Sequence, residues 1–219
     1  MFIGNRLTAE LVTVRPDDKI LSARRIMLEK KIRHLPVVDE KGKLIGIVSD
    51  RDIRDAMPSK LSEQSAEEVI GEFTVADIMS KDPVTIREYH TLQDALLVMH
   101  SKKVGAFPVI DEAGTLKGII STRDIMKAFI NMLNIEEQGT LLCIVVEEKP
   151  GQLKKVVDII SEEKISLGSV LVGRHWDENR RAIFPYLLTC NVATVKRRLM
   201  ESGFELIEPM DWYLDQMPQ

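Results

Sequence analysis

The apolar positions of the first 130 residues follow one pattern twice. A short apolar run, Leu11–Val14 or Val84–Ile86, comes first. Apolar residues at spacings of 0, 3 and 7 follow it, which is typical of one face of an amphipathic helix. Two more apolar runs then flank a polar turn that ends in Gly42 or Gly114. Glycine permits the positive φ that a hairpin turn requires, so the two runs predict a β-hairpin. A final helix follows, so each copy predicts the order β-α-β-β-α.

The two copies align without a gap when residues 7–57 are shifted by 72 positions onto 79–129. Identical residues occupy 20 of the 51 aligned positions, including the pair Pro36 and Pro108. Chance does not produce this agreement, so the first 130 residues are interpreted as a duplicated module. A unit of about 50 residues is too small to bury a full core alone, and we expect the copies to pack on each other.

Short polar side chains stand where the helices of each copy should begin. Asp17 or Asp18 is expected to cap the first helix of copy one, and Thr91 the first helix of copy two. Ser49 and Ser121 are expected to open the last helices.

The residues after the duplication follow a different pattern, β-α-β-β-α-β, which is typical of a split βαβ or ferredoxin-like sandwich. Its first and third strands are antiparallel neighbours, and this would bring Cys143 near Cys190. Two cysteines cannot form a disulfide framework here, so we expect two reduced core side chains. The expected strands are 141–146, 167–172, 182–190 and 204–209, and the expected helices are 150–163 and 192–203.

The chain is expected to divide at two polar linkers. The segment Pro58–Phe73 is polar and acidic and predicts a surface helix between the copies. The predicted organisation is repeat 1 at 1–57, an inter-repeat segment at 58–74, repeat 2 at 75–130, a linker at 131–138 and a C-terminal unit at 139–219.

Composition narrows the class of protein. The 219 residues are 44% apolar and 29% charged, which excludes a disordered chain. The longest aliphatic stretch, Leu141–Val146, is far shorter than the roughly 20 residues of a membrane span. The first residues lack a basic region followed by an apolar one, so no secretory signal is expected and the interpretation is a cytoplasmic protein. A net charge of −4 is a poor match to a nucleic-acid binder.

The run Gly46–Asp52 and its counterpart Gly118–Asp124 carry the strongest chemical signal. A helix N-terminus with a serine hydroxyl and free N–H groups favours an anion or a ribose oxygen. An aspartate three residues later can accept hydrogen bonds from both ribose hydroxyls. The alternative is a capping box with nothing bound, which a single occurrence would favour. Both copies keep Ser, Arg and Asp while neighbouring surface positions differ, and this favours a ligand.

These runs, each with the segment before its hairpin, resemble a known family. Ile32–Asp39 with the first run resembles a CBS domain, and Val104–Asp111 with the second run resembles another. Together they resemble a CBS pair, or Bateman module. The C-terminal unit, through Glu147–Leu153, is similar to an ACT domain, although it has Glu148 where that family often has Asp. The order CBS–CBS–ACT is similar to the acetoin-utilisation B (AcuB) family of bacterial regulatory proteins. The fold implied is α/β and α+β, with two packed CBS repeats and a ferredoxin-like ACT domain.

The resemblance implies an adenine nucleotide (AMP, ADP or ATP) in two clefts between the repeats, and in some members NAD or S-adenosylmethionine. Ser49 and Asp52 would hold the ribose in one cleft, and Ser121 and Asp124 in the other. The remaining candidate contacts lie before each hairpin and on the last helices; they are Ile32, Arg33, His34, Val104, Gly105, Ala106, Arg51 and Arg123.

The two clefts are expected to differ. In the Ser49/Asp52 cleft, residues 104–106 would flank the adenine while Arg33 and His34 face the phosphates, so this cleft is predicted to be the better site. In the other cleft Ile32, Arg33 and His34 take the place of the small residues. The arginines at 51 and 123 are either phosphate contacts or exposed helix residues.

ACT units usually pair side by side, and an exposed sheet edge favours such pairing, so a homodimer is expected. An amino acid would bind near the first turn of the unit, at Glu148, Lys149, Pro150, Gly151 and Leu153. Since the sequence has no nucleophile–base pair and no metal-ligand spacing, we expect no enzyme and no metal site. The predicted function is a regulatory ligand sensor acting on an unidentified protein, and the alternative is an assembly module with empty clefts.

Overall fold

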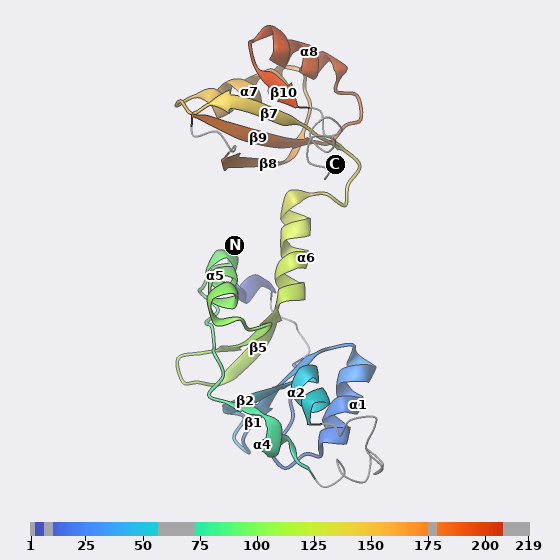
Figure 1. Ribbon diagram of the computed structural model, residues 1–219, viewed down its shortest axis with the longest axis vertical. Helices are drawn as coiled ribbons and strands as arrows, with labels where there is room; N and C mark the ends of the chain where they lie inside the picture. The colour runs from blue at the N-terminus through green and yellow to red at the C-terminus, as the bar shows by residue number, and fades with distance from the viewer. Residues whose placement is uncertain (1–2, 7–10, 57–72, 175–178, 208–219) are drawn as a thin grey trace, which may run out of the picture. The chain divides into compact units, whose positions relative to one another are not determined.

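In the computed structural model the described residues are 3–6, 11–56, 73–174 and 179–207. The chain forms two compact units, Met1–Met126 and Lys127–Gln219 (Figure 1). The division falls inside helix α6 (Thr122–Leu133), before the predicted linker at 131–138. The surface helix predicted between the repeats lies outside the described residues, except for Phe73.

Repeat 1 of the first unit is a hairpin covered by helices. Helix α1 (Ile20–Lys30) leads into strands β1 (His34–Val38) and β2 (Leu44–Ser49), and helix α2 (Asp50–Asp55) follows. The strands pair antiparallel, with His34 opposite Ser49. The buried helix residues Ile20, Ala23 and Met27 confirm the predicted apolar face.

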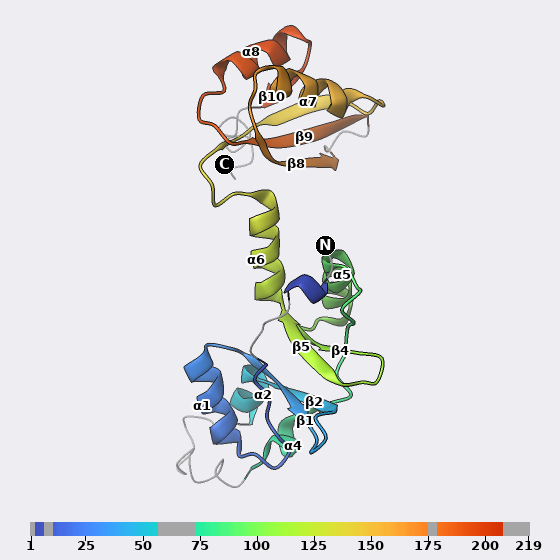
Figure 2. The same cartoon turned by 180° about the vertical axis from the view of Figure 1, so that it is seen from behind.

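Repeat 2 has the same construction. Its first residues form helix α4 (Val75–Ile78) and strand β3 (Ser80–Lys81), and β3 pairs antiparallel with β2 of repeat 1. Helix α5 (Leu92–Lys102), strands β4 (Ala106–Ile110) and β5 (Leu116–Ser121), and helix α6 follow. Its hairpin register places Ala106 opposite Ser121, the equivalent of the pairing in repeat 1. The hairpins of the two repeats are visible from both sides of the unit (Figures 1 and 2).

The first strand predicted for each repeat is reduced to a single paired residue. Val14 forms a single parallel bridge to Val37, and Ile86 forms the equivalent bridge to Val109, but neither lies in a longer strand. The hairpin turns are confirmed, because Gly42 and Gly114 have φ of 77° and 82°.

The predicted caps are only partly confirmed. Thr91 caps α5, because its Oγ accepts a hydrogen bond from the Asp94 N–H at 3.1 Å, and the Asp94 carboxylate accepts from the Thr91 N–H at 2.8 Å. The predicted Asp17 or Asp18 cap of α1 is wrong. Lys19 stands at that position without a side-chain cap, because the Asp18 carboxylate instead accepts from the Arg15 N–H at 2.7 Å and closes the preceding turn.

Each repeat is completed by the first residues of the other. The Val75 N–H donates to the Asp18 carbonyl of repeat 1 at 2.8 Å, and the Ile3 N–H donates to the His90 carbonyl of repeat 2 at 2.9 Å. These two bonds are related by the same shift of 72 residues. Ile3 and Val75 are both fully buried. The structural repeat therefore begins four residues before the aligned copies, at Ile3 and Val75.

The C-terminal unit confirms the predicted order β-α-β-β-α-β. A short strand, β6, comes first. The strands are β6 (Thr140–Leu141), β7 (Cys143–Glu147), β8 (Leu167–Arg174), β9 (Arg180–Leu187) and β10 (Glu205–Ile207), and the helices are α7 (Gln152–Glu162) and α8 (Ala193–Glu201). All neighbouring strands are antiparallel, in the order β10-β7-β9-β8, with β6 beside the end of β9. Side chains of both helices pack into one core with the sheet.

The two cysteines are free, but they are not neighbours across the sheet, and the prediction that both are core side chains is wrong. Cys143 lies opposite Ile207 on β10, while Cys190 is exposed beyond the end of β9. Burial, with a smaller contribution from the Glu205 charge, raises the pKa of the Cys143 thiol. Among the residues that the structure describes, no helix is long and apolar enough to cross a membrane.

Candidate functional site

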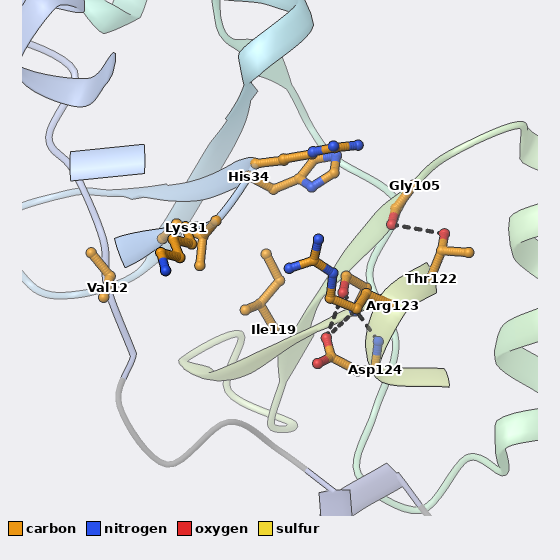
Figure 3. Close-up of a pocket in the computed structure, with 11 residues that line it drawn as sticks. Val12, Lys31, His34, Gly105, Ile119, Thr122, Arg123 and Asp124 are labelled. Atoms are coloured by element: carbon orange, nitrogen blue, oxygen red, sulfur yellow. Dashed lines mark hydrogen bonds between the residues drawn. The ribbon is translucent and has the colours of Figure 1, made fainter. Parts of the chain in front are cut away.

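A cavity of about 350 Å³ lies between the two repeats of the first unit. Its walls come from the segment before β1 in repeat 1 and from the β5–α6 junction in repeat 2 (Figure 3). Cavities of this size are within the range that small ligands occupy. The lining residues are Val12, Lys31, Ile32, Arg33, His34, Gly105, Ile119, Ser121, Thr122, Arg123 and Asp124.

The repeat 2 wall is built around the start of α6. The Ser121 hydroxyl donates to Asp124 Oδ2 at 2.6 Å, and the Ser121 N–H donates to the same oxygen at 2.8 Å. The Asp124 N–H donates back to the Ser121 hydroxyl at 3.4 Å. No described residue donates to the second carboxylate oxygen, Oδ1, so it can accept a hydroxyl group of a ligand.

Repeat 1 reproduces this arrangement. The Ser49 hydroxyl donates to Asp52 Oδ2 at 2.7 Å, and the Asp52 N–H donates to the Ser49 hydroxyl at 3.3 Å. The capping box that the sequence offered as an alternative is therefore present at both positions. It does not compete with a ligand role, because the cap engages only one oxygen of each aspartate.

The repeat 1 wall of the cavity carries Lys31, Arg33 and His34 and is called the basic wall below. Lys31 ends α1 in the left-handed conformation, with φ of 54°, and Arg33 and His34 follow it. A Cβ on Gly105 would lie 3.3 Å from His34 Nε2, so the glycine allows the imidazole to approach the facing repeat closely. Figure 3 shows Lys31 and His34 on one side of the cavity and Arg123 on the other.

The His34 ring is half-buried in this wall. Burial lowers the pKa of the imidazole from its ordinary value, while the Asp52 charge opposes this shift and the Arg33 charge reinforces it. The neutral ring is therefore favoured near pH 7. A neutral imidazole can both donate and accept a hydrogen bond, and it presents an apolar face to a stacked base.

The structure brings together seven of the residues proposed from the sequence: Ile32, Arg33, His34, Gly105, Ser121, Arg123 and Asp124. Val104, Ala106, Ser49, Asp52 and Arg51 do not line this cavity. The sequence predicts Arg33 and His34 at both clefts, on the phosphate side of the Ser49/Asp52 cleft and in place of the small residues beside Ser121 and Asp124. In the structure both line the cavity of Ser121 and Asp124.

Four lining residues were missed: Val12, Lys31, Ile119 and Thr122. Three of them had a signal in the sequence, because Val12, Lys31 and Ile119 are identical to their counterparts in the other repeat. Thr122 had none. Its hydroxyl donates to the Gly105 carbonyl at 3.1 Å and ties the start of α6 to the segment before β4.

A second cavity, of about 560 Å³, lies in the C-terminal unit where β7 leads into α7. Its lining includes all five residues proposed there from the sequence: Glu148, Lys149, Pro150, Gly151 and Leu153. Arg181 of β9 also lines it and forms an ion pair with Glu148, which the sequence did not predict. Gly151 begins α7 with φ of 88° and provides no side-chain cap to the helix.

Comparison with known proteins identifies the class of the first unit. The CBS domain family matches residues 4–59 and 75–131, which correspond to the two repeats. The chain belongs to the CBS domain family, and its first unit is a tandem pair of these domains.

Relatives match the same part of the chain. A CBS domain-containing protein of Dictyostelium discoideum is 32% identical over 136 residues, which is 61% of this chain and 94% of that protein. Inosine-5′-monophosphate dehydrogenase of Aquifex aeolicus is 37% identical over 117 residues, or 53% of this chain. The chain spans only 22% of the dehydrogenase.

Solved structures share the CBS pair fold, and some of them are complexes with adenosine compounds. CBSX2 of Arabidopsis thaliana, in complex with AMP, is 28% identical with a TM-score of 0.52 and covers 59% of this chain and 96% of its own. The CBS pair of protein MJ0100, in complex with 5′-methylthioadenosine and S-adenosyl-L-methionine, is 26% identical with a TM-score of 0.51, covering 59% and 95%. A putative acetoin utilization protein (AcuB) of Vibrio cholerae is 27% identical with a TM-score of 0.52, covering 62% and 95%.

Proposed function

We propose that this protein is a regulatory module that senses an adenine nucleotide in the cavity between its CBS repeats. The observation that carries the proposal is the cavity itself, with a serine–aspartate pair on one wall and basic side chains on the other. The free oxygen of Asp124 suits the ribose hydroxyls, and Arg123 and Arg33 suit the phosphates. Relatives of the same fold in complex with AMP or with adenosine compounds support this ligand class.

The nucleotide would act by favouring one arrangement of the protein over another, because a ligand shifts a conformational equilibrium by its difference in affinity for the two states. AMP, ADP and ATP are the leading ligands, and NAD or S-adenosylmethionine would fill the same type of cleft. Ser49, Asp52 and Arg51, with Val104 and Ala106 of the other repeat, form a second candidate cleft. The module carries no catalysis of its own in this proposal.

The C-terminal unit is proposed to be an ACT domain with a ferredoxin-like fold. The antiparallel order β10-β7-β9-β8, with two helices on one core, supports the proposal. The cavity beside Gly151 would take an amino acid, since the uncapped N–H groups at the start of α7 favour a carboxylate. The β8 edge of the sheet would pair with a second copy to form a homodimer.

The wider role proposed is regulation of a partner protein in the cytoplasm, in acetoin utilisation or a related process. The CBS–CBS–ACT order and the similarity to the putative acetoin utilization protein support this role. The alternative is an assembly module with empty clefts. The retained Ser and Asp in both repeats favour the sensor.

Calorimetric titration of the full chain with AMP, ADP and ATP tests the nucleotide proposal. We expect at least one nucleotide to bind at micromolar concentration. The Ser121→Ala variant should bind more weakly, because it loses the hydroxyl that orients Asp124. The absence of any heat of binding for all three nucleotides at millimolar concentration would favour the assembly module.

A further inference from the structure

The backbone around the cavity closely resembles the backbone at the equivalent positions on the Ser49 side of the pair. Lys31 and Lys103 both end the first helix of their repeat in the left-handed conformation, with φ of 54° and 53°. The Asp50 N–H donates to the Arg33 carbonyl at 2.9 Å, and the Thr122 N–H donates to the Gly105 carbonyl at 3.0 Å. Differences between the clefts therefore come from side chains.

Two of these differences change charge. Arg33 in repeat 1 corresponds to Gly105 in repeat 2, and Thr122 in repeat 2 corresponds to Asp50 in repeat 1. The cavity at Ser121 and Asp124 therefore receives Arg33 from the facing repeat and has a neutral threonine at the helix start. The equivalent positions of the Ser49 cleft provide a glycine and a carboxylate, and that carboxylate pairs with Arg54 at 3.1 Å.

The side chains that line the cavity carry more positive than negative formal charge. Lys31, Arg33 and Arg123 are cations, and Asp124 is the single carboxylate among the lining residues. The Asp124 carboxylate also accepts hydrogen bonds from the Ser121 N–H and hydroxyl, which partly offset its negative charge. A ligand in this cavity therefore meets an excess of positive charge, most of it on the side opposite to the ribose-binding pair.

We infer that this cavity selects nucleoside polyphosphates and disfavours uncharged or cationic adenosine compounds. This inference rests on the proposed nucleotide function and specifies the ligand class of the same site. All adenosine compounds share the base and the ribose, so the ribose-binding pair cannot tell them apart. Selection must come from the basic wall, where ATP carries more negative charge than AMP and 5′-methylthioadenosine carries none.

The test compares ATP, AMP and 5′-methylthioadenosine by calorimetric titration of the full chain. Binding that disappears in the Asp124→Ala variant is assigned to the cavity. We expect affinity to fall in the order ATP, AMP, 5′-methylthioadenosine, with at least tenfold between the first and the last. Added salt should weaken ATP binding and leave 5′-methylthioadenosine binding unchanged, because screening acts on charged ligands.

Two matched variants test the basic wall. Lys31→Asn removes a lining cation, and Lys103→Asn removes the corresponding lysine of repeat 2, which does not line the cavity. Asparagine tolerates the left-handed conformation at both positions. Lys31→Asn should weaken ATP binding in the cavity about fivefold, as expected for an exposed ion pair, and spare 5′-methylthioadenosine. Lys103→Asn should change neither.

The outcomes separate this inference from the function on which it rests. If ATP and 5′-methylthioadenosine bind the cavity within threefold of each other, the selectivity is wrong and the nucleotide function stands. Equal losses of ATP binding in the two lysine variants would also contradict the role of the basic wall. If none of the three ligands binds, the proposed function itself fails.

Discussion

Replacing Asp124 with alanine should have two separable effects on thermal stability. The first is loss of the cap of α6, in which Asp124 accepts from the Ser121 N–H and hydroxyl at 2.8 and 2.6 Å. Loss of such a cap costs about 1 kcal/mol. For a unit of this size, that corresponds to a fall in Tm of about 4 °C.

The second effect is loss of the stabilisation by nucleotide. A ligand present at 100 times its Kd stabilises the folded protein by about 2.7 kcal/mol. At about 4 °C per kcal/mol, the first unit of the parent protein should then melt about 10 °C higher with nucleotide than without it. The Asp124→Ala variant should show little of this rise, since the carboxylate that holds the ribose is gone.

Asp94→Ala is the matched control. Asp94 caps α5 with nearly the same geometry, accepting from the Thr91 N–H at 2.8 Å and from its hydroxyl at 2.7 Å, but it does not line the cavity. Its loss should lower the Tm without ligand by a similar amount and keep the full nucleotide-dependent rise. Melting curves by circular dichroism, with and without ATP, measure both effects. An Asp124→Ala variant with the same nucleotide-dependent rise as Asp94→Ala would refute the ribose assignment.

Three further outcomes follow from the structure. Ile3→Ala should destabilise the first unit by about 2–5 kcal/mol, since the Ile3 side chain is fully buried. A denaturant midpoint equal to that of the parent protein would contradict the exchange of segments between repeats, in which the first residues of each repeat complete the other. Hydrogen bonds from Thr91 lower the pKa of Asp94 in the folded protein. Their contribution to the stability of the fold is therefore present above about pH 4 and is lost as the pH falls through the lowered pKa. Asp94→Asn should therefore flatten the acid limb of a stability–pH curve, and an unchanged limb would exclude this contribution. A neutral alkylating reagent should modify exposed Cys190 before Cys143, whose thiol pKa burial raises; peptide mass mapping showing the reverse order would contradict these environments.

Local chemistry made much of the first unit predictable. The hairpin turns follow from Gly42 and Gly114, which alone relieve the strain of positive φ at those positions. The Thr91 cap follows from a hydroxyl three residues before a carboxylate. The predicted cap of α1 was wrong because the Asp18 carboxylate had two possible N–H donors. It accepts from the Arg15 N–H of the preceding turn and not from the start of the helix.

The exchange of segments between repeats could not be predicted in the same way. It depends on backbone hydrogen bonds such as that of the Ile3 N–H to the His90 carbonyl, and backbone groups carry no sequence signal. Lys31 was missed although Lys103 repeats it. A lysine at the end of a helix is typical of a solvated position, and only the packing of the two repeats places it on a cavity.

The candidate site was predictable where the repeat preserved it. Ser121 and Asp124 were found because Ser49 and Asp52 repeat them, and their capping geometry is nearly identical. Arg33 was predicted at both clefts, because a choice between them requires the direction in which a loop side chain extends, and the sequence does not encode that direction.

Native mass spectrometry of the full chain mixed with ATP tests the central claim most directly, because it counts the nucleotides bound to each folded protein. We predict at least one ATP per chain for the parent protein, one fewer for Asp124→Ala, and the parent number for Asp94→Ala. A spectrum without any nucleotide-bound parent protein, at concentrations where the folded charge states persist, would contradict the account.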